Sequence, residues 1–422
     1  MSWLKASLAT AAAQISRMIG GLIVIKIIAV YLGPEGFGRL GHFMSLIAIL
    51  TVLAGGGILN GLVKYVAEYK NTPSKLYPFL SNALAYSLIF SLCIFIAIAV
   101  SAKYISLLLF GSDEFTHLII FLGVLQFFYG MVTYCNGTIN GLRETKTFAK
   151  IIIIGTLIGV PSAYVLVVSY GFAGAVIALA IINACLLVPG FIEFRKLDLF
   201  QHIKLVLNKQ DAVSLSKFSV MQIFSLITLP LAEIYIRNLI IHDAGWQEAG
   251  VWQSLMRLSS VYVGFFTTFL AAYYLPTLSG ILNKQAVVKY VSRYVLVTGG
   301  VFVIIGVMVY FFREFVFSVI FTKEFVIPAE YVRFQLIGDF FKIMAYVIGF
   351  LLVAKAKGRL YIFAELIQTA LYLGVTTWLV KIGEISKVFP AYALSNFMYF
   401  SICIFGLWWF QYVSIERNTS QT

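Results

Sequence analysis

Residues 6–32 read ASLATAAAQISRMIGGLIVIKIIAVYL, an apolar stretch interrupted only by Arg17 and Lys26. An α-helix needs about 20 such residues to cross about 30 Å of hydrocarbon. The stretch therefore predicts a membrane-spanning helix with two cations inside it. Because a charge at that depth costs about 3 kcal/mol or more, each cation is expected to face a partner or a hydrated cavity.

Similar stretches recur to the end of the chain. Of its 422 residues, 61% are hydrophobic and 12% charged, and the mean hydropathy is +0.93, which excludes a soluble globular protein. We expect an all-α integral membrane protein with twelve spans. The twelve predicted spans are 6–32, 38–67, 78–101, 115–140, 149–170, 172–193, 214–240, 249–278, 290–312, 328–354, 359–381 and 388–411.

The distribution of charge predicts the orientation. With both termini cytoplasmic, the inner loops and adjoining helix ends carry 19 Lys/Arg and 6 Asp/Glu, against 6 and 9 on the outer side. Cytoplasmic loops are enriched in Lys and Arg, so the net charge of +13 reflects topology rather than a polyanionic partner such as nucleic acid. Because Arg17 interrupts the first apolar run and no cleavage site ends it, we interpret that run as an uncleaved span.

The chain divides near its middle into lobes 1–193 and 214–422, joined by a cytoplasmic linker over 194–213. Short matches recur between the lobes at a nearly constant spacing, as for Gly38 with Gly250, which indicates an internal duplication. Six helices per lobe imply parallel repeats with a site between them.

The first helix of each lobe also carries helix-weakening residues at equivalent places. These are Gly20 with Gly21 in the first lobe and Pro230 in the second. They are interpreted either as hinges used in transport or as fixed kinks.

Apart from residues at the helix ends, which are counted with the loops, nine ionisable residues lie inside the predicted spans. Six of them are cations, which favours a cavity that receives an anion. Arg17 lies near the middle of its helix, and Arg257 has no carboxylate within a turn. The candidate substrate-binding residues are Arg17, Lys26, Arg237 and Arg257, with Arg333 expected at the outer interface.

The acids of the spans allow two interpretations. Glu233 with Arg237, and Asp339 with Lys342, are spaced as ion pairs along a helix. The same acids and Glu365 could instead bind a proton or Na⁺ during transport, because burial favours the protonated carboxyl. Glu233, Asp339, Lys342 and Glu365 are therefore candidates for structural ion pairs or for coupling groups.

Residue patterns for catalysis or metal binding are lacking. The four histidines are scattered, the four cysteines lie in predicted spans without CxxC spacing, and no phosphate-binding glycine loop occurs. The outer loops are too short for the catalytic loop of a membrane polymerase or ligase. We expect no enzyme activity, no metal and no cofactor beyond a coupling proton or sodium ion.

Several segments resemble the polysaccharide-transport flippases of the Wzx type, in the multidrug/oligosaccharidyl-lipid/polysaccharide (MOP) superfamily. The segment GPEGFG follows the first helix, LAGGGILNG lies in the second, and FQLIGDFFK lies in the tenth. Their ranges are Gly33–Gly38, Leu53–Gly61 and Phe334–Lys342, with further likeness at Lys64–Tyr69 and Leu275–Ser279.

The resemblance implies the MOP flippase fold, with two six-helix lobes around a central cavity. It also implies transport, by alternating access, of an undecaprenyl-pyrophosphate-linked oligosaccharide of the lipid III or O-antigen type. The movement would run from the cytoplasmic to the periplasmic leaflet of the bacterial inner membrane, alongside polysaccharide polymerase and chain-length proteins. Arginine pairs with pyrophosphate in a fixed fork, in agreement with the cationic spans. The alternatives are a polymerase or ligase, a multidrug exporter of the same superfamily, and a cell-wall-precursor flippase, whose family usually has two more helices.

Overall fold

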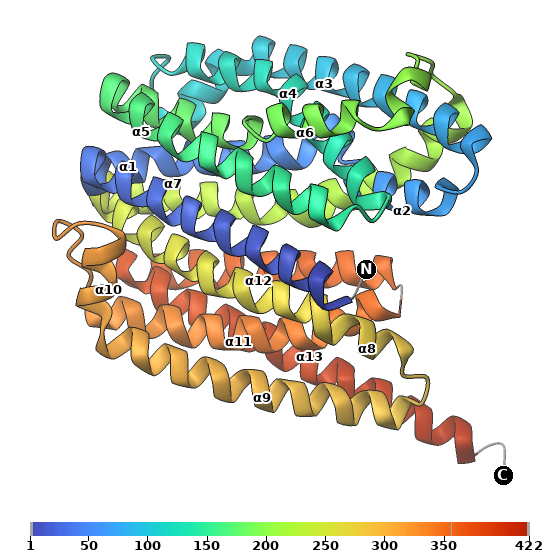
Figure 1. Ribbon diagram of the computed structural model, residues 1–422. Helices are drawn as coiled ribbons and strands as arrows, with labels where there is room; N and C mark the ends of the chain where they lie inside the picture. Colours follow the sequence, from blue (N-terminus) through green and yellow to red (C-terminus); the bar gives the residue numbers. More distant parts are fainter. Residues whose placement is uncertain (1–2, 356, 420–422) are drawn as a thin grey trace. The chain divides into compact units, whose positions relative to one another are not determined.

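The computed structural model describes residues 3–355 and 357–419, which fold as α-helices joined by short turns (Figure 1). The chain forms two compact units, residues 1–234 and 235–422, and the boundary falls within one long helix. The first unit contains α1 (Trp3–Leu53), η1 (Ala54–Gly56), α2 (Leu59–Tyr69), α3 (Pro73–Phe110), α4 (Thr116–Gly141), α5 (Thr145–Ala184), α6 (Leu187–Arg195), η2 (Asp198–His202) and the first part of α7 (Lys209–Phe269).

The second unit holds the rest of α7 and all that follows it. Its elements are η3 (Leu270–Tyr274), α8 (Leu275–Gly280), α9 (Lys284–Phe311), α10 (Arg313–Ile320), α11 (Ala329–Ala354), α12 (Gly358–Ile382), η4 (Ile385–Lys387) and α13 (Val388–Thr419).

Apolar helices of membrane-spanning length run through both units. In the described part of the chain, eight helical segments are long and apolar enough to cross a bilayer. Two of these, Ala11–Tyr69 and Thr145–Arg195, have 59 and 51 residues, and each covers two predicted spans. The predicted spans 214–240 and 249–278 fall in α7, η3 and α8. The chain is a multi-pass, all-α membrane protein, as its composition predicts.

Glycines make the sharp turns between consecutive spans. Gly33 in α1 has φ 63° and ψ −173°, and Gly245 in α7 has φ 82° and ψ −179°. These backbone angles lie in a region that a Cβ atom disfavours, so glycine permits the reversal at each site. Each helix continues on both sides of its glycine, so α1 and α7 each contain two of the predicted spans.

The helix boundaries agree with the duplication predicted from sequence. Gly33 and Gly245 share one backbone conformation, and their positions differ by 212 (245 − 33). The starts of α3 and α9 differ by 211 (284 − 73), and those of α5 and α12 by 213 (358 − 145). Both halves therefore place equivalent helices in the same order along the chain.

The second predicted span of each half is interrupted where the sequence alone suggests a continuous helix. In 38–67, Gly55, Gly56 and Gly57 have φ of 60°, 83° and 65°, so η1 and a turn separate α1 from α2. In 249–278, the chain widens into the π-helical turn η3. Pro276 follows that turn and has no N–H group for a regular helical hydrogen bond, which gives a local cause for the distortion.

Two other segments differ from the sequence-based expectation. The predicted span 172–193 is not one helix, because a turn at Cys185–Leu186 separates α5 from α6. The outer connection 313–327, expected to be a loop, contains the short helix α10. Phe317 gives the reason, since its buried ring is one turn from Phe321, with ring centres 5.6 Å apart.

In the first unit α1 packs along α5, and Gly20 allows the close approach. A Cβ atom on Gly20 would lie 2.3 Å from Cγ2 of Thr156. The Thr156 side chain is itself fixed by a 2.8 Å hydrogen bond to the carbonyl of Ile152. Next to it, a Cβ atom on Gly21 would meet open space. The helix is continuous through both residues, so packing explains Gly20 in this conformation, and a hinge there stays a prediction.

We predict that Gly20→Leu destabilises the protein by about 1–3 kcal/mol, because the new side chain overpacks the contact between α1 and α5. Thermal melting of the purified protein in detergent measures the effect. Gly21→Leu is the matched control, since it adds the same side chain in open space, and its melting temperature should stay near that of the unsubstituted protein. Equal losses in both variants would contradict the packing role of Gly20.

Candidate functional site

The predicted cations of the first unit lie on α1 with different exposure. Arg17, near the middle of the first span, is exposed, whereas Lys26 is half-buried. An exposed guanidinium at that depth is stable only beside water or a counter-ion, because transfer into hydrocarbon is unfavourable. The face of α1 that carries Arg17 therefore requires a hydrated environment.

Arg237 has a different setting on α7. Its side chain is fully buried, donates a 2.7 Å hydrogen bond to Oε1 of Gln253, and lies 5.4 Å from the ring centre of Trp252. A cation is stabilised over an indole ring, and the amide oxygen satisfies one guanidinium hydrogen. In this conformation Arg237 is held by the second unit itself, and no guanidinium surface is exposed to a ligand. Arg257, farther along α7, is half-buried.

The most extensive polar cluster surrounds Asp339, which is fully buried on α11. Its carboxylate accepts hydrogen bonds from Ser259 at 2.7 Å, from Tyr392 at 2.7 Å, from Gln335 at 3.1 Å and from the hydroxyl of Tyr262. The four donors come from α7, α11 and α13, so the carboxylate links three helices of the second unit. Burial of an ionised carboxylate is tolerated only with such a set of donors.

Gln335 leaves one acceptor of this cluster unused. Its side chain is 2% exposed, and Oε1 has no hydrogen-bond partner among the residues that the structure describes. Together with the carboxylate and the three hydroxyl groups, this atom makes the cluster rich in oxygen. Hard cations such as Na⁺ prefer oxygen ligands, and a carboxylate can also take up a proton.

Lys342 lies near this cluster but is not one of the four donors to the Asp339 carboxylate described above. Its ammonium nitrogen is 5.8 Å from the ring centre of Tyr392, on the same ring whose hydroxyl donates to Asp339. Lys342 also acts electrostatically on Glu365, which is half-buried on α12 and hydrogen-bonded by Tyr361. The lysine therefore lies between two acids of the second unit.

The remaining candidate residues from the sequence analysis have ordinary structural roles in helices. Glu233 is half-buried, and its Oε2 is 3.5 Å from the hydroxyl of Ser45 within the first unit. Arg333 is exposed and lies 3.6 Å from Glu330, as expected of an interfacial pair. Pro230 lies inside α7, where it removes one backbone hydrogen bond.

The internal duplication shows that Asp339 is special to the second unit. The residue 213 positions earlier (339 − 126) is Gln126, also fully buried. Gln126 donates a 3.1 Å hydrogen bond to the carbonyl of Leu50, and Leu50 is 212 positions before Tyr262. The same packing position thus holds a neutral amide in one repeat and an acid in the other. Only the acid can change its charge.

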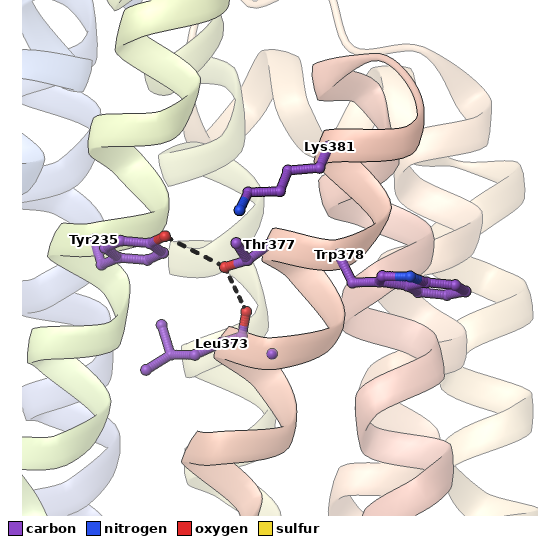
Figure 2. Close-up of a pocket in the computed structure, with 6 residues that line it drawn as sticks. Tyr235, Leu373, Thr377, Trp378 and Lys381 are labelled. Atoms are coloured by element: carbon purple, nitrogen blue, oxygen red, sulfur yellow. Dashed lines mark hydrogen bonds between the residues drawn. The ribbon is translucent and has the colours of Figure 1, made fainter.

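A groove lies between α7 and α12 of the second unit, with a volume of about 500 Å³. Its lining residues are Tyr235, Leu373, Gly374, Thr377, Trp378 and Lys381 (Figure 2). The hydroxyl oxygens of Tyr235 and Thr377 are 3.4 Å apart, and Thr377 donates a 2.8 Å hydrogen bond to the carbonyl of Leu373. Sequence reasoning missed this groove, because its polar residues look like ordinary helix-end residues.

Residues 3–282 match the family described as "Polysaccharide biosynthesis protein". The chain is 33% identical over 412 residues to proteins named "Lipid III flippase" from Escherichia coli (strain K12) and Shigella flexneri, covering 97% of this chain and 99% of each relative. These relatives are named as flippases, in agreement with the expectation that the chain is not an enzyme.

The solved structures share the fold. A MATE family multidrug transporter of the MOP superfamily in an inward-facing conformation superposes with TM-score 0.78, at 15% identity, over 96% of both chains. An outward-facing structure of a MATE family transporter gives TM-score 0.67, at 15% identity, over 98% of this chain and 97% of that chain. At this identity the likeness concerns the fold alone, and it confirms the predicted superfamily fold.

We predict that Asp339→Asn destabilises the protein by about 1–3 kcal/mol, because an amide has one acceptor oxygen where four donors converge. Thermal melting in detergent measures the loss. Glu330→Gln, at an exposed site on the same helix, makes the equivalent change and should leave the melting temperature nearly unchanged. If both variants melt together, the hydrogen bonds to Asp339 do not stabilise the fold.

Proposed function

Because the chain belongs to the polysaccharide biosynthesis protein family, and within it to the Wzx type of flippase of the MOP superfamily, we propose that it moves an undecaprenyl-pyrophosphate-linked oligosaccharide from the cytoplasmic to the periplasmic leaflet. The observation that carries the proposal is the identity of 33% to the lipid III flippases over almost the whole of both chains. The substrate is then a repeat unit of the lipid III type, as in enterobacterial common antigen assembly.

The pyrophosphate is bound by cations of the spans. Arg17 supports this role, since an exposed guanidinium in the middle of an apolar helix needs a hydrated or anionic neighbour. Arg257 and Lys26, both half-buried, are the next candidates. Arg237 acts less directly, because Gln253 and Trp252 already hold its guanidinium, and it positions the start of the following span.

The coupling ion binds at Asp339. The cluster offers a carboxylate, three hydroxyl oxygens and the unused Oε1 of Gln335 in a buried site that links α7, α11 and α13. Uptake of a proton or Na⁺ would neutralise the carboxylate and weaken the hydrogen bonds that join these helices. A change of charge in one place would thus alter helix packing, as transport by alternating access requires. Glu365, beside Lys342, is the second candidate for the coupling group.

Two other functions fit less well. A multidrug exporter shares the fold, but organic cations would be repelled by spans that carry six cations and three acids. A polymerase or ligase would require a catalytic loop, whereas the outer connection 312–328 contains only the short helix α10 and a few further residues. Transport together with polysaccharide polymerase and chain-length proteins of the inner membrane, with both termini cytoplasmic, is the arrangement we propose.

We predict that Arg17→Ala and Arg257→Ala each lower surface glycan assembly about tenfold or more, because each removes a charged hydrogen-bond donor from the pyrophosphate. Glycan is measured in cells that depend on this chain, with protein accumulation followed in the membrane fraction. Arg333→Ala is the matched control, since it removes an exposed arginine paired with Glu330. Normal glycan in Arg17→Ala or Arg257→Ala removes that residue from the site.

We further predict that Asp339→Asn loses the dependence of transport on an imposed ion gradient, because its amide carries no titratable charge. Reconstituted vesicles are compared with a pH gradient, a Na⁺ gradient and neither, and initial rates are normalised to folded protein. Glu365→Gln is tested in parallel. If Asp339→Asn keeps the full gradient dependence while Glu365→Gln loses it, the coupling group is Glu365. If both keep it, neither acid couples transport.

A further inference from the structure

The groove between α7 and α12 has one polar wall. In Figure 2 the Lys381 side chain extends on the same side of α12 as Thr377, with its ammonium nitrogen toward α7 and Tyr235. Among the described residues, no hydrogen bond or ion pair is made by the Lys381 ammonium group. The charge distribution predicts that the end of α12 that carries Lys381 faces away from the cytoplasm.

The hydroxyl groups of the groove are arranged to favour an incoming acceptor. The Thr377 hydroxyl donates to the carbonyl of Leu373 at 2.8 Å, and in its longer contact of 3.4 Å the oxygen of Tyr235 is the acceptor, so that contact does not use the tyrosine hydrogen. A bond of that length is weak. An oxyanion placed between Tyr235 and Lys381 would receive the tyrosine hydrogen and the ammonium together, and such charge-assisted hydrogen bonds are stronger.

The aromatic ring of the groove does not provide a platform for a sugar. Trp378 extends away from Tyr235 and Lys381 in Figure 2, and 58% of its surface is exposed. Tryptophan in such a position at a helix end is typical of the membrane interface. The groove therefore combines the apolar residues Leu373 and Gly374 with the cationic Lys381, near the helix end that is predicted to lie on the outer side.

The other repeat lacks the lysine of this set and has a tyrosine in place of the threonine. The residues 213 positions before Thr377 and Lys381 are Tyr164 and Val168, and the residue 212 positions before Tyr235 is Ile23. Between α1 and α5, Tyr31 and Tyr164 meet with ring centres 6.4 Å apart. The Tyr235, Thr377 and Lys381 set is thus no general feature of this helix pair, which favours a role specific to the second unit.

We propose that this groove binds the phosphate group of a prenyl pyrophosphate lipid in the outer leaflet, with Lys381 and Tyr235 as ligands and Thr377 as the residue that positions Tyr235. The volume of about 500 Å³ lies in the range of ligand sites and suits a pyrophosphate with the first part of its prenyl chain. The inference rests on the proposed transport function and adds a site at which the translocated lipid is held before release.

The test is protection of lysines from chemical modification. The purified full-length protein in lipid nanodiscs is treated with an amine-reactive reagent, and modification at each lysine is read by mass spectrometry with and without farnesyl pyrophosphate. We expect modification of Lys381 to fall about fivefold or more, and that of Lys323, in the connection between α10 and α11, to stay unchanged. Tyr235→Phe, which keeps the lysine and the ring, should lose most of the protection, as loss of a hydrogen bond to a charged group predicts.

Separate probes identify the source of the phosphate. Inorganic pyrophosphate and phosphatidylglycerol at the same concentration should each protect Lys381 less than farnesyl pyrophosphate does. Equal protection by inorganic pyrophosphate would overturn the lipid assignment in favour of a free anion, and equal protection by phosphatidylglycerol would reduce the groove to a general anionic-lipid contact. Absence of protection by all three would overturn the site.

A transport measurement separates this proposal from the proposed function. Vesicles with the unsubstituted protein should move a prenyl-pyrophosphate-linked saccharide, and Lys381→Met should slow that movement several-fold while Lys323→Met does not. If the unsubstituted protein transports and Lys381→Met transports equally well, the groove has no role although the function stands. If the unsubstituted protein moves no such lipid, the proposed function fails, even where Lys381 is protected.

Discussion

The unfavourable transfer of charge into hydrocarbon governs the interior of this protein. Asp339 is the clearest case, since it is fully buried and four donors from three helices satisfy its carboxylate. The buried guanidinium of Arg237 is likewise stabilised by the amide oxygen of Gln253 and the indole ring of Trp252. Asp339 therefore joins three helices, whereas Arg237 joins the two parts of α7 on either side of Gly245, and removal of either charge changes packing as well as electrostatics. A buried charge that holds helices together suits the coupling role that we propose for Asp339.

Comparison of the two repeats distinguishes backbone features that both share from side chains that only one of them carries. Gly33 and Gly245 make the same turn at equivalent places in the two repeats, so the backbone plan is common to both halves. Side chains at equivalent positions differ: Gln126 corresponds to Asp339, and Val168 to Lys381. The second unit thus carries the titratable acid and the cationic groove, while the first carries the exposed Arg17. The two repeats therefore share the helical backbone, and they differ in the charged side chains that it carries.

The second predicted span of each repeat has irregular backbone at a depth where most of the chain is regular helix. The three glycines at positive φ after Ala54 separate two helical segments inside a predicted span, and the π-helical turn η3 distorts the corresponding span of the other repeat. Irregular backbone at membrane depth is stable only when it is buried in protein or lines a hydrated cavity. Gly55 to Gly57 are buried, and a Cβ on Gly55 would lie 2.5 Å from the Ser87 hydroxyl, so close packing is part of their role.

The sequence by itself determined the membrane-spanning class, the duplication and the family, and it selected the ionisable residues of the spans. Hydropathy and glycine placement are local properties, and they decide where apolar helices run and where the chain reverses. Only the tertiary structure decided the partners of those residues. It gave Asp339 two tyrosines, a serine and a glutamine where i,i+3 spacing suggested Lys342, and it brought Tyr235 beside Thr377, far along the chain. The physical reason is that a charge in an apolar medium takes partners from whichever helices pack against it, and spacing along one helix does not reveal them.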